Sequence, residues 1–172
     1  MKVHVLREAG LEEAMLGLSL SYDQPIDRMP EVARKLMVRG GAHTKFLESI
    51  VVWLDITAPR YWWQQFDTYR VGVTKQSGST MHNILKQGVD QTHFEGGISR
   101  ETLIRINELI FAKALMQVKR ELPESYRQRR IVCLNYKVIN HIIQQREKHL
   151  LNEWRFFCSV MRDVLTFKEF LK

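Results

Sequence analysis

The sequence of 172 residues predicts a single α/β domain. Short runs rich in β-branched and aromatic residues have the pattern of strands, and the segments between them repeat apolar side chains at helical spacing. Hydrophobic residues make up 45% and charged residues 26%, as in globular proteins. Because this length suffices to bury one core, the predicted domain covers residues 1–172.

The first third of the chain is predicted to hold one strand and two helices. Residues 2–6 alternate polar and apolar side chains, which is typical of an edge strand, and Gly10 interrupts this pattern. Residues 11–20 predict a short helix. A second helix is expected to begin at Pro30, which suits a first turn, and to end at Gly40 and Gly41.

The next part is predicted to contain a central strand and an aromatic helix. Residues 50–57 are β-rich and almost continuously apolar, so they predict a buried strand. Thr57 is expected to cap the following helix and Pro59 to lie in its first turn. One apolar face predicts that this helix continues to a glycine–serine loop, with Trp62, Phe66, Tyr69 and Val73.

The second half is predicted to be mostly helical. Residues 86–97 carry three glycines and little periodicity, so they predict a loop. Ser99 is expected to cap a long helix that stops before Leu122 and Pro123. A short strand at residues 130–134 and helices at residues 136–149 and 153–165 complete the prediction.

Positive charge is concentrated in the second half of the chain. The net charge is +7, and the segment from Lys113 to Arg155 has ten lysines and arginines against four glutamates and no aspartate. Such a cluster suits a phosphate-bearing partner, either a nucleotide or a nucleic acid. A solvated helix face explains the same cluster, and the sequence leaves both interpretations open.

Several functional classes are not indicated. Cys133 and Cys158 are isolated, which favours a reduced, cytoplasmic protein, and no apolar run is long enough to predict a membrane span. His141 and His149 lack further residues that would complete a metal site, so no metal is expected. No phosphate-binding glycine loop or nucleophile motif occurs, so any chemistry is expected to come from a bound cofactor.

One arginine is predicted to lie on a buried helix face. If a helix begins near Asn135, then Ile139, Ile142 and Arg146 share its apolar side. A buried guanidinium needs a partner, and an internal salt bridge or a ligand satisfies it equally well. Lys137 and His141 fall on another face, where a surface pair is the simplest interpretation.

Several of these stretches together resemble one family, the flavin-dependent thymidylate synthases, also called thymidylate synthase-complementing proteins. The family's strand ending in Ala-Pro, its helix with glutamine three residues before Arg-His-Arg, and its serine loop are similar to residues 58–79. Its His-x-Thr-x-x-Glu is similar to residues 43–48. Downstream, Pro123 is followed after twelve residues by Asn135 and then after eleven by Arg146. The resemblance covers about residues 21–154 and is greatest to short phage and bacterial homologues.

The resemblance implies a fold and a reaction. The fold is an α/β (α+β) arrangement in which helices flank a small, mostly antiparallel sheet. The implied enzyme is an FAD-dependent methyltransferase that reductively methylates dUMP to dTMP. Its carbon comes from methylenetetrahydrofolate and its hydride from NADPH through FAD. The family's enzymes are homotetramers with sites between subunits.

Site residues are also implied, position by position. The flavin-side residues are His43, Glu48, Arg70, Asn135, Lys137 and His141. The nucleotide would be held by Gln65, Ser77, Ser79, Lys119 and Arg146. Of these, Gln65 and Arg146 are the implied catalytic residues because they would polarise the uracil, and no protein nucleophile is expected.

The sequence departs from the family at charged positions. Thr68-Tyr69-Arg70 stands at the family's Arg-His-Arg, the Ser-x-Arg of the loop lacks its arginine, and Lys119 replaces another arginine. Each lost charge-assisted contact is worth about 1.5–3 kcal/mol, so weaker nucleotide binding is predicted. Two alternatives to the enzyme remain: a non-catalytic homologue that binds nucleotide or nucleic acid through the basic C-terminal half, and a structural oligomer.

Overall fold

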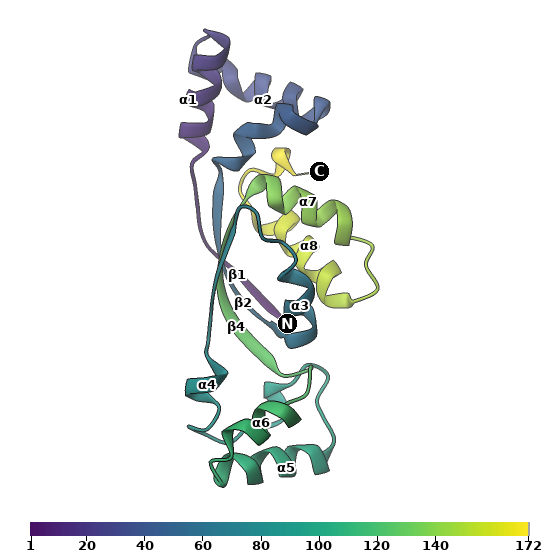
Figure 1. Cartoon of the computed structure of the whole chain (residues 1–172). Helices are drawn as coiled ribbons and strands as arrows, with labels where there is room; N and C mark the ends of the chain where they lie inside the picture. The colour runs from purple at the N-terminus through teal and green to yellow at the C-terminus, as the bar shows by residue number, and fades with distance from the viewer. Residues whose placement is uncertain (172) are drawn as a thin grey trace. The chain divides into compact units, whose positions relative to one another are not determined.

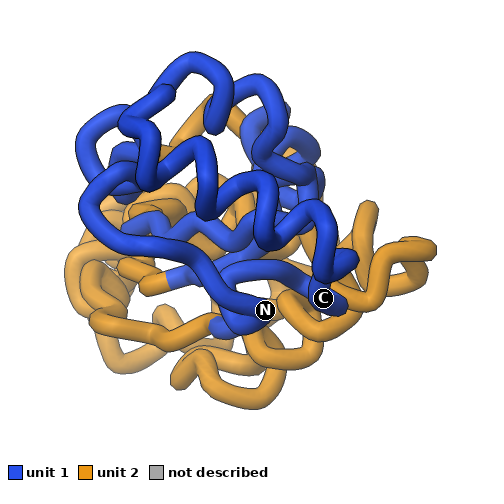
Figure 2. Tube along the Cα trace, turned by 90° about the horizontal axis from the view of Figure 1, so that it is seen from below, with its two compact units in different colours: residues 1–2, 56–68, 76–131 blue, residues 3–55, 69–75, 132–172 orange. Residues whose placement is uncertain are grey.

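The computed structural model describes residues 1–171, which divide into two compact units (Figure 2). Unit 1 comprises residues 1–2, 56–68 and 76–131, and unit 2 comprises residues 3–55, 69–75 and those from 132 onward. The chain crosses between the units five times, so neither unit is a continuous stretch of sequence. The single domain over residues 1–172 stays a prediction.

The strands form one four-stranded antiparallel sheet in the order β1-β2-β4-β3. They are β1 (Lys2–Ala9), β2 (Val51–Pro59), β3 (Val73–Ser77) and β4 (Arg127–Asn135), of which β1, β2 and β4 are labelled in Figure 1. In unit 1 the Gly78 N–H donates to the Arg129 carbonyl at 3.0 Å. In unit 2 Gly72 lies against Asn135, so β3 and β4 run in opposite directions. The predicted small antiparallel sheet, with β1 at its edge and β2 inside, is confirmed.

Unit 1 contains four helices within the described chain: α3 (Arg60–Phe66), α4 (Thr80–Asn83), α5 (Arg100–Phe111) and α6 (Leu115–Glu121). The Ser99 side chain caps α5 as predicted, accepting from the Thr102 N–H at 3.2 Å. The predicted long helix is broken, because Lys113 adopts a left-handed conformation with φ of 55°. This break lets α6 fold back on α5, and both bury Ile106, Ile110 and Val118 in one core.

The aromatic helix is shorter than predicted. It ends at Phe66, and Val73 already belongs to β3, a strand that the sequence analysis missed. Gly72, with φ of 68°, turns the chain in a way that no α-helix permits. The N-terminus also differs, because Pro59 is the cap residue and Thr57 lies within β2.

The helices of unit 2 follow the prediction closely: α1 (Leu11–Tyr22), α2 (Met29–Arg39), α7 (Tyr136–Arg146) and α8 (Asn152–Val164). Gly10 begins α1 with φ of 95°, and a Cβ there would lie 2.1 Å from the Ser49 carbonyl oxygen. Only glycine therefore fits this turn. Helices α7 and α8 pack side by side (Figure 1) and bury residues such as Ile139, Ile142 and Trp154.

The Glu8 carboxylate binds the C-terminal segment of unit 2 through hydrogen bonds. Glu8 accepts from the Tyr136 hydroxyl at 2.5 Å and from the Thr166 N–H at 3.0 Å. Burial, and then the bond to Glu8, raise the pKa of Tyr136. The short 3₁₀ helix η4 (Lys168–Phe170) follows, and buried Phe170 anchors it.

Candidate functional site

All six residues predicted on the flavin side lie in unit 2. They come from the 3₁₀ segment η2 (Gly41–Glu48), from the turn before β3, and from the first half of α7. Segment η2 packs directly against α7. Tertiary packing therefore brings together two stretches that are about ninety residues apart in the sequence.

An ion pair joins these two stretches. The Lys137 Nζ lies 2.5 Å from Glu48 Oε1, and both side chains are about half exposed. The hydrogen bond from Lys137, and then its charge, lower the pKa of Glu48. Because the pair is exposed, opening it for a ligand costs little.

Asn135 occupies the start of α7. Its Oδ1 accepts from the Val138 N–H at 3.0 Å, so it is the N-cap of the helix that the sequence analysis expected to begin near this point. A Cβ on Gly72 would lie 2.8 Å from Asn135 Nδ2, which shows how closely the turn carrying Arg70 approaches the helix. Arg70 itself is exposed, as are His43 and His141.

Arg146 lies at the end of α7 against aromatic rings, on the helix face that was predicted to be buried. Its Nε donates to the Tyr69 hydroxyl at 3.0 Å, and that hydroxyl donates to Gln145 Oε1 at 2.8 Å. The guanidinium carbon lies 4.9 Å from the centre of the Trp154 ring. Sequence analysis missed the partners Gln145 and Trp154, although Tyr69 stood out as the residue at the family's histidine.

Unit 1 contains an open hollow of about 390 Å³, within the range of small-molecule sites. The loop residues Gly78, Ser79 and Thr80 form part of its lining, together with residues of β4. Among the described residues that line it, none is Asp or Glu, whereas Lys2 and Arg129 are among its cations. Such a lining favours an anionic or polar ligand.

The loop beside this hollow is held from several directions. Lys119 Nζ donates to Thr80 Oγ1 at 2.6 Å, and Gln128 Nε2 donates to the Gly78 carbonyl at 3.1 Å. Of the predicted substrate residues, Ser79 lines the hollow, whereas Lys119 is not a lining residue and is connected to the hollow through its bond to Thr80. Ser77, exposed on β3, and Gln65, half-buried on α3, are not among its lining residues.

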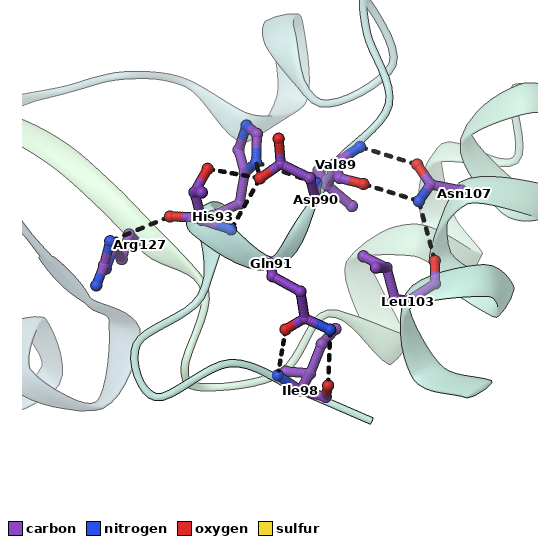
Figure 3. A network of polar contacts seen from close by, with 9 residues as sticks. Val89, Asp90, Gln91, His93, Ile98, Leu103, Asn107 and Arg127 are labelled. Atoms are coloured by element: carbon purple, nitrogen blue, oxygen red, sulfur yellow. Dashed lines mark hydrogen bonds and ion pairs between the residues drawn. The ribbon is translucent and has the colours of Figure 1, made fainter. Parts of the chain in front are cut away.

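Side-chain amides hold the segment between residues 86 and 98, part of which lines the hollow (Figure 3). Asn107 Oδ1 accepts from the Val89 N–H, and Asn107 Nδ2 donates to the Val89 carbonyl, both at 2.8 Å. Gln91 makes the same double contact with Ile98 at 2.9 Å. Each amide side chain thus bonds the N–H and the carbonyl of one backbone residue, as a neighbouring strand would in a sheet. No sequence pattern predicted these contacts.

An ion pair supports the same segment. Arg127 Nε donates to Glu95 Oε2 at 2.9 Å. Arg127 also donates to the Thr92 carbonyl at 3.1 Å, a contact drawn in Figure 3. Burial acts to raise the pKa of Glu95, but the hydrogen bonds from the N-terminal ammonium and Arg127 outweigh it, so the pKa is lowered. Glu95 therefore compensates the charge of Arg127, which makes Arg127 a structural cation.

Comparison with known proteins identifies the fold. No protein-family model and no curated protein matches the sequence. A solved structure of a flavin-dependent thymidylate synthase from Helicobacter pylori, complexed with FAD and dUMP, matches 100% of both chains with a TM-score of 0.78 and 15% identity. The chain has the fold of the flavin-dependent thymidylate synthases. The fold expected from the resemblance is thereby confirmed.

Two further structures agree. A second structure of the Helicobacter pylori enzyme with FAD and dUMP matches 98% of this chain and 95% of its own, with a TM-score of 0.78 and 15% identity. A UMP/dUMP methylase from Streptomyces cacaoi, bound with 5-Br dUMP, matches 94% of this chain and 88% of its own. Its TM-score is 0.67 at 12% identity. At such identities the likeness concerns the fold.

The described residues 1–171 contain neither a membrane-spanning helix nor a cluster of metal ligands. No helix among them is long and apolar enough to cross a membrane. No group of three or more histidine, cysteine, aspartate or glutamate side chains in this range is arranged to hold a metal ion.

Proposed function

We propose that the protein is a flavin-dependent thymidylate synthase-like enzyme that methylates dUMP to dTMP. FAD would be its cofactor, with methylenetetrahydrofolate and NADPH as co-substrates. The observation that carries this proposal is the end-to-end match, over 100% of both chains, to a structure that holds FAD and dUMP together. The methylase that binds 5-Br dUMP supports a pyrimidine nucleotide as the substrate class.

The flavin-side residues suit an anionic dinucleotide. Arg70 and Lys137 supply positive charge, and the imidazoles of His43 and His141 are exposed on the same unit. Asn135 is held at the start of α7 by its capping bond. In this proposal these residues would bind FAD together with Glu48, and the flavin, once reduced by NADPH, would supply the hydride that reduces the transferred carbon.

The nucleotide's phosphate suits the hollow of unit 1. Lys119 contributes an ammonium beside the loop through its 2.6 Å bond to Thr80, and Ser79 contributes a hydroxyl. The absence of carboxylates among the described lining residues favours a dianionic phosphate there. Ser77, the last residue of β3, is assigned to the same substrate set by the resemblance to the family.

Two residues are proposed to polarise the pyrimidine ring. Arg146 offers a guanidinium, whose planar fork of donors matches a pyrimidine edge, and Gln65 offers an amide. Both would stabilise negative charge that develops on the ring during carbon transfer. We also propose that the protein assembles as a homo-oligomer, in the tetrameric form that the resemblance implies.

Purification with flavin analysis tests this function. The expected result is a yellow protein that retains FAD and forms dTMP from dUMP, methylenetetrahydrofolate and NADPH. An Arg146→Ala variant, prepared in parallel, serves as the control with reduced dTMP formation. A colourless protein that takes up no FAD, forms no dTMP and fails to rescue a thymidine auxotroph would contradict the proposal.

The alternative of a non-catalytic nucleic-acid-binding homologue gains no support from the comparisons. It would be recognised by DNA or RNA binding that falls steeply with salt concentration, in a protein that takes up no flavin. The cytoplasmic location and the phage-like origin stay predictions.

A further inference from the structure

We infer that Tyr69 is a positioning residue for Arg146: its hydroxyl fixes the orientation of the guanidinium that meets the pyrimidine nucleotide. This inference rests on the proposed function, in which Arg146 is a substrate residue. It gives a role to the position at which the sequence departs most visibly from the family's Arg-His-Arg.

The contact is made at one particular nitrogen. Arg146 donates through Nε to the Tyr69 hydroxyl at 3.0 Å. An acceptor at Nε lies on the side of the guanidinium that Nε shares with one terminal nitrogen, so the end formed by the two terminal nitrogens faces another direction. Those terminal groups form the fork with which arginine recognises flat, polar ligands. The bond therefore orients the recognising end of Arg146.

A third residue fixes the hydroxyl. Tyr69 has one hydroxyl proton, and it is donated to Gln145 Oε1 at 2.8 Å. Since this proton is committed to Gln145, a lone pair of the phenol oxygen is directed to Arg146. Gln145 and Arg146 are neighbours on α7, so one helix end supplies both partners of the phenol.

Aromatic packing immobilises both partners. The Tyr69 ring is 8% exposed and lies edge-on to Trp154, with ring centres 6.0 Å apart. The guanidinium carbon of Arg146 lies 4.9 Å from the same Trp154 ring and 5.9 Å from the Tyr69 ring. Trp154 is fully buried. A rigid floor of this kind limits the rotamers of a long side chain and lowers the entropy lost on binding.

The chemistry of the acceptor matters as much as its place. A phenol hydroxyl is a neutral acceptor, so it holds the guanidinium without cancelling its positive charge. A carboxylate at the same point would hold it and compete with an electron-rich ligand. A histidine side chain is shorter than tyrosine and would not place a ring nitrogen where the phenol oxygen lies. The tyrosine is therefore suited to this contact in a way that the family's histidine is not.

The test uses Tyr69→Phe, which removes only the hydroxyl and keeps the buried ring. The expected result is that KM and Kd for dUMP rise about tenfold or more, the range for a hydrogen bond to a charged group. FAD uptake is expected to stay unchanged. In an Arg146→Ala background, Tyr69→Phe should add no further loss of dUMP affinity, because the two residues act as one unit.

Tyr136→Phe is the matched control. It makes the same change in the same unit and removes the hydroxyl bonded to Glu8 at 2.5 Å. It is expected to lower stability and to leave the Kd for dUMP as in the wild type. This control separates the loss of any buried phenol from the loss of the contact with Arg146.

Two results would overturn the inference. One is a Tyr69→Phe enzyme with wild-type KM and Kd for dUMP, and the other is a Tyr69→Phe effect that persists in full in the Arg146→Ala background. If the wild type binds neither FAD nor dUMP, the proposed function itself fails. The contact is then tested by unfolding of the single and double variants, where additive losses of stability would show that Tyr69 does not hold Arg146.

Discussion

Each of the two units has an arginine over a tryptophan ring, but the two arginines are held by different chemistry. In unit 1 the Arg130 guanidinium carbon lies 4.4 Å from the centre of the Trp63 ring. The Nη1 of Arg130 donates to both carboxylate oxygens of Asp67, at 2.9 and 3.1 Å. In unit 2 Arg146 lies 4.9 Å from Trp154, and its Nε donates to the hydroxyl of Tyr69.

The partner of each arginine, rather than the ring beneath it, distinguishes the two. The carboxylate of Asp67 compensates the charge of Arg130, and Gln128 Oε1 accepts from its Nη2 at 3.0 Å, so Arg130 is fixed as part of the framework. The phenol of Tyr69 orients Arg146 and leaves its positive charge uncompensated by that bond. Stacking on tryptophan is therefore no sign of function by itself.

The largest effect is expected when a ring beneath an arginine is removed. Trp154 is fully buried, so Trp154→Ala is expected to lower the free energy of unfolding by about 3–5 kcal/mol. Urea denaturation measures this loss. Phe156→Ala, on the same helix but 45% exposed, is the control and should change stability little. Similar losses for both variants would show that the Trp154 ring is not a core element.

Replacing the two arginines separates framework from function. Arg146→Ala is expected to lower kcat/KM for dUMP by about ten- to a hundredfold, because it removes a charge-assisted contact. Arg130→Ala is expected to reduce stability by about 1–3 kcal/mol and leave the KM for dUMP unchanged. Steady-state kinetics and urea denaturation of both variants give the comparison. Loss of dUMP affinity in Arg130→Ala at full FAD content would contradict it.

A third cation tests the hollow of unit 1. Lys119→Ala is expected to weaken dUMP binding about tenfold and leave deoxyuridine binding unchanged, since only the phosphate would contact the ammonium. Lys119→Arg is expected to strengthen dUMP binding, because a fork replaces a point charge. Titration calorimetry measures both. Arg120→Ala, an exposed cation on the same helix, is the control, and equal losses in it would indicate only a general charge effect.

The smallest effect concerns the exposed ion pair of unit 2. Lys137 lowers the pKa of Glu48 in the folded protein, so this carboxylate contributes stability that is present above its ordinary pKa and is lost as the pH falls through the lowered one. Lys137→Ala is expected to remove this contribution. The free energy of unfolding of the variant should therefore fall slightly less than that of the wild type when the pH is lowered below about 4.5. Urea denaturation at several pH values measures the difference. Identical acid profiles would mean that the pair is open in solution.

Local physical chemistry made much of the fold predictable. The edge strand β1, the central strand β2 and the helices of unit 2 agree with the sequence patterns, because periodicity and capping act over a few neighbouring residues. Ser99 caps its helix as expected, and a helix begins directly after Asn135, near the expected point. The resemblance to the family also held for the fold, although at 15% identity it rested on the order and spacing of short motifs.

The errors lie where long-range contacts outweigh local pattern. Tyr69 and Val73 have helical spacing after Trp62, yet the turn at Gly72 sends the chain into β3, which gains a partner in β4. The long helix breaks at Lys113 because folding α6 back on α5 buries one common core. In both cases the free energy gained by pairing or burial with distant residues exceeds the cost of breaking the local helical conformation.

By itself, then, the sequence determined strands β1, β2 and β4, most helices and the positions that match a flavin-dependent fold. Tertiary structure alone decided which residues contact the candidate site side chains. The pairing of Lys137 with Glu48, the floor of Trp154 beneath Arg146, and the hold of Tyr69 on its Nε each join residues from different elements. Spacing along a chain cannot specify such contacts, because they depend on how whole elements pack.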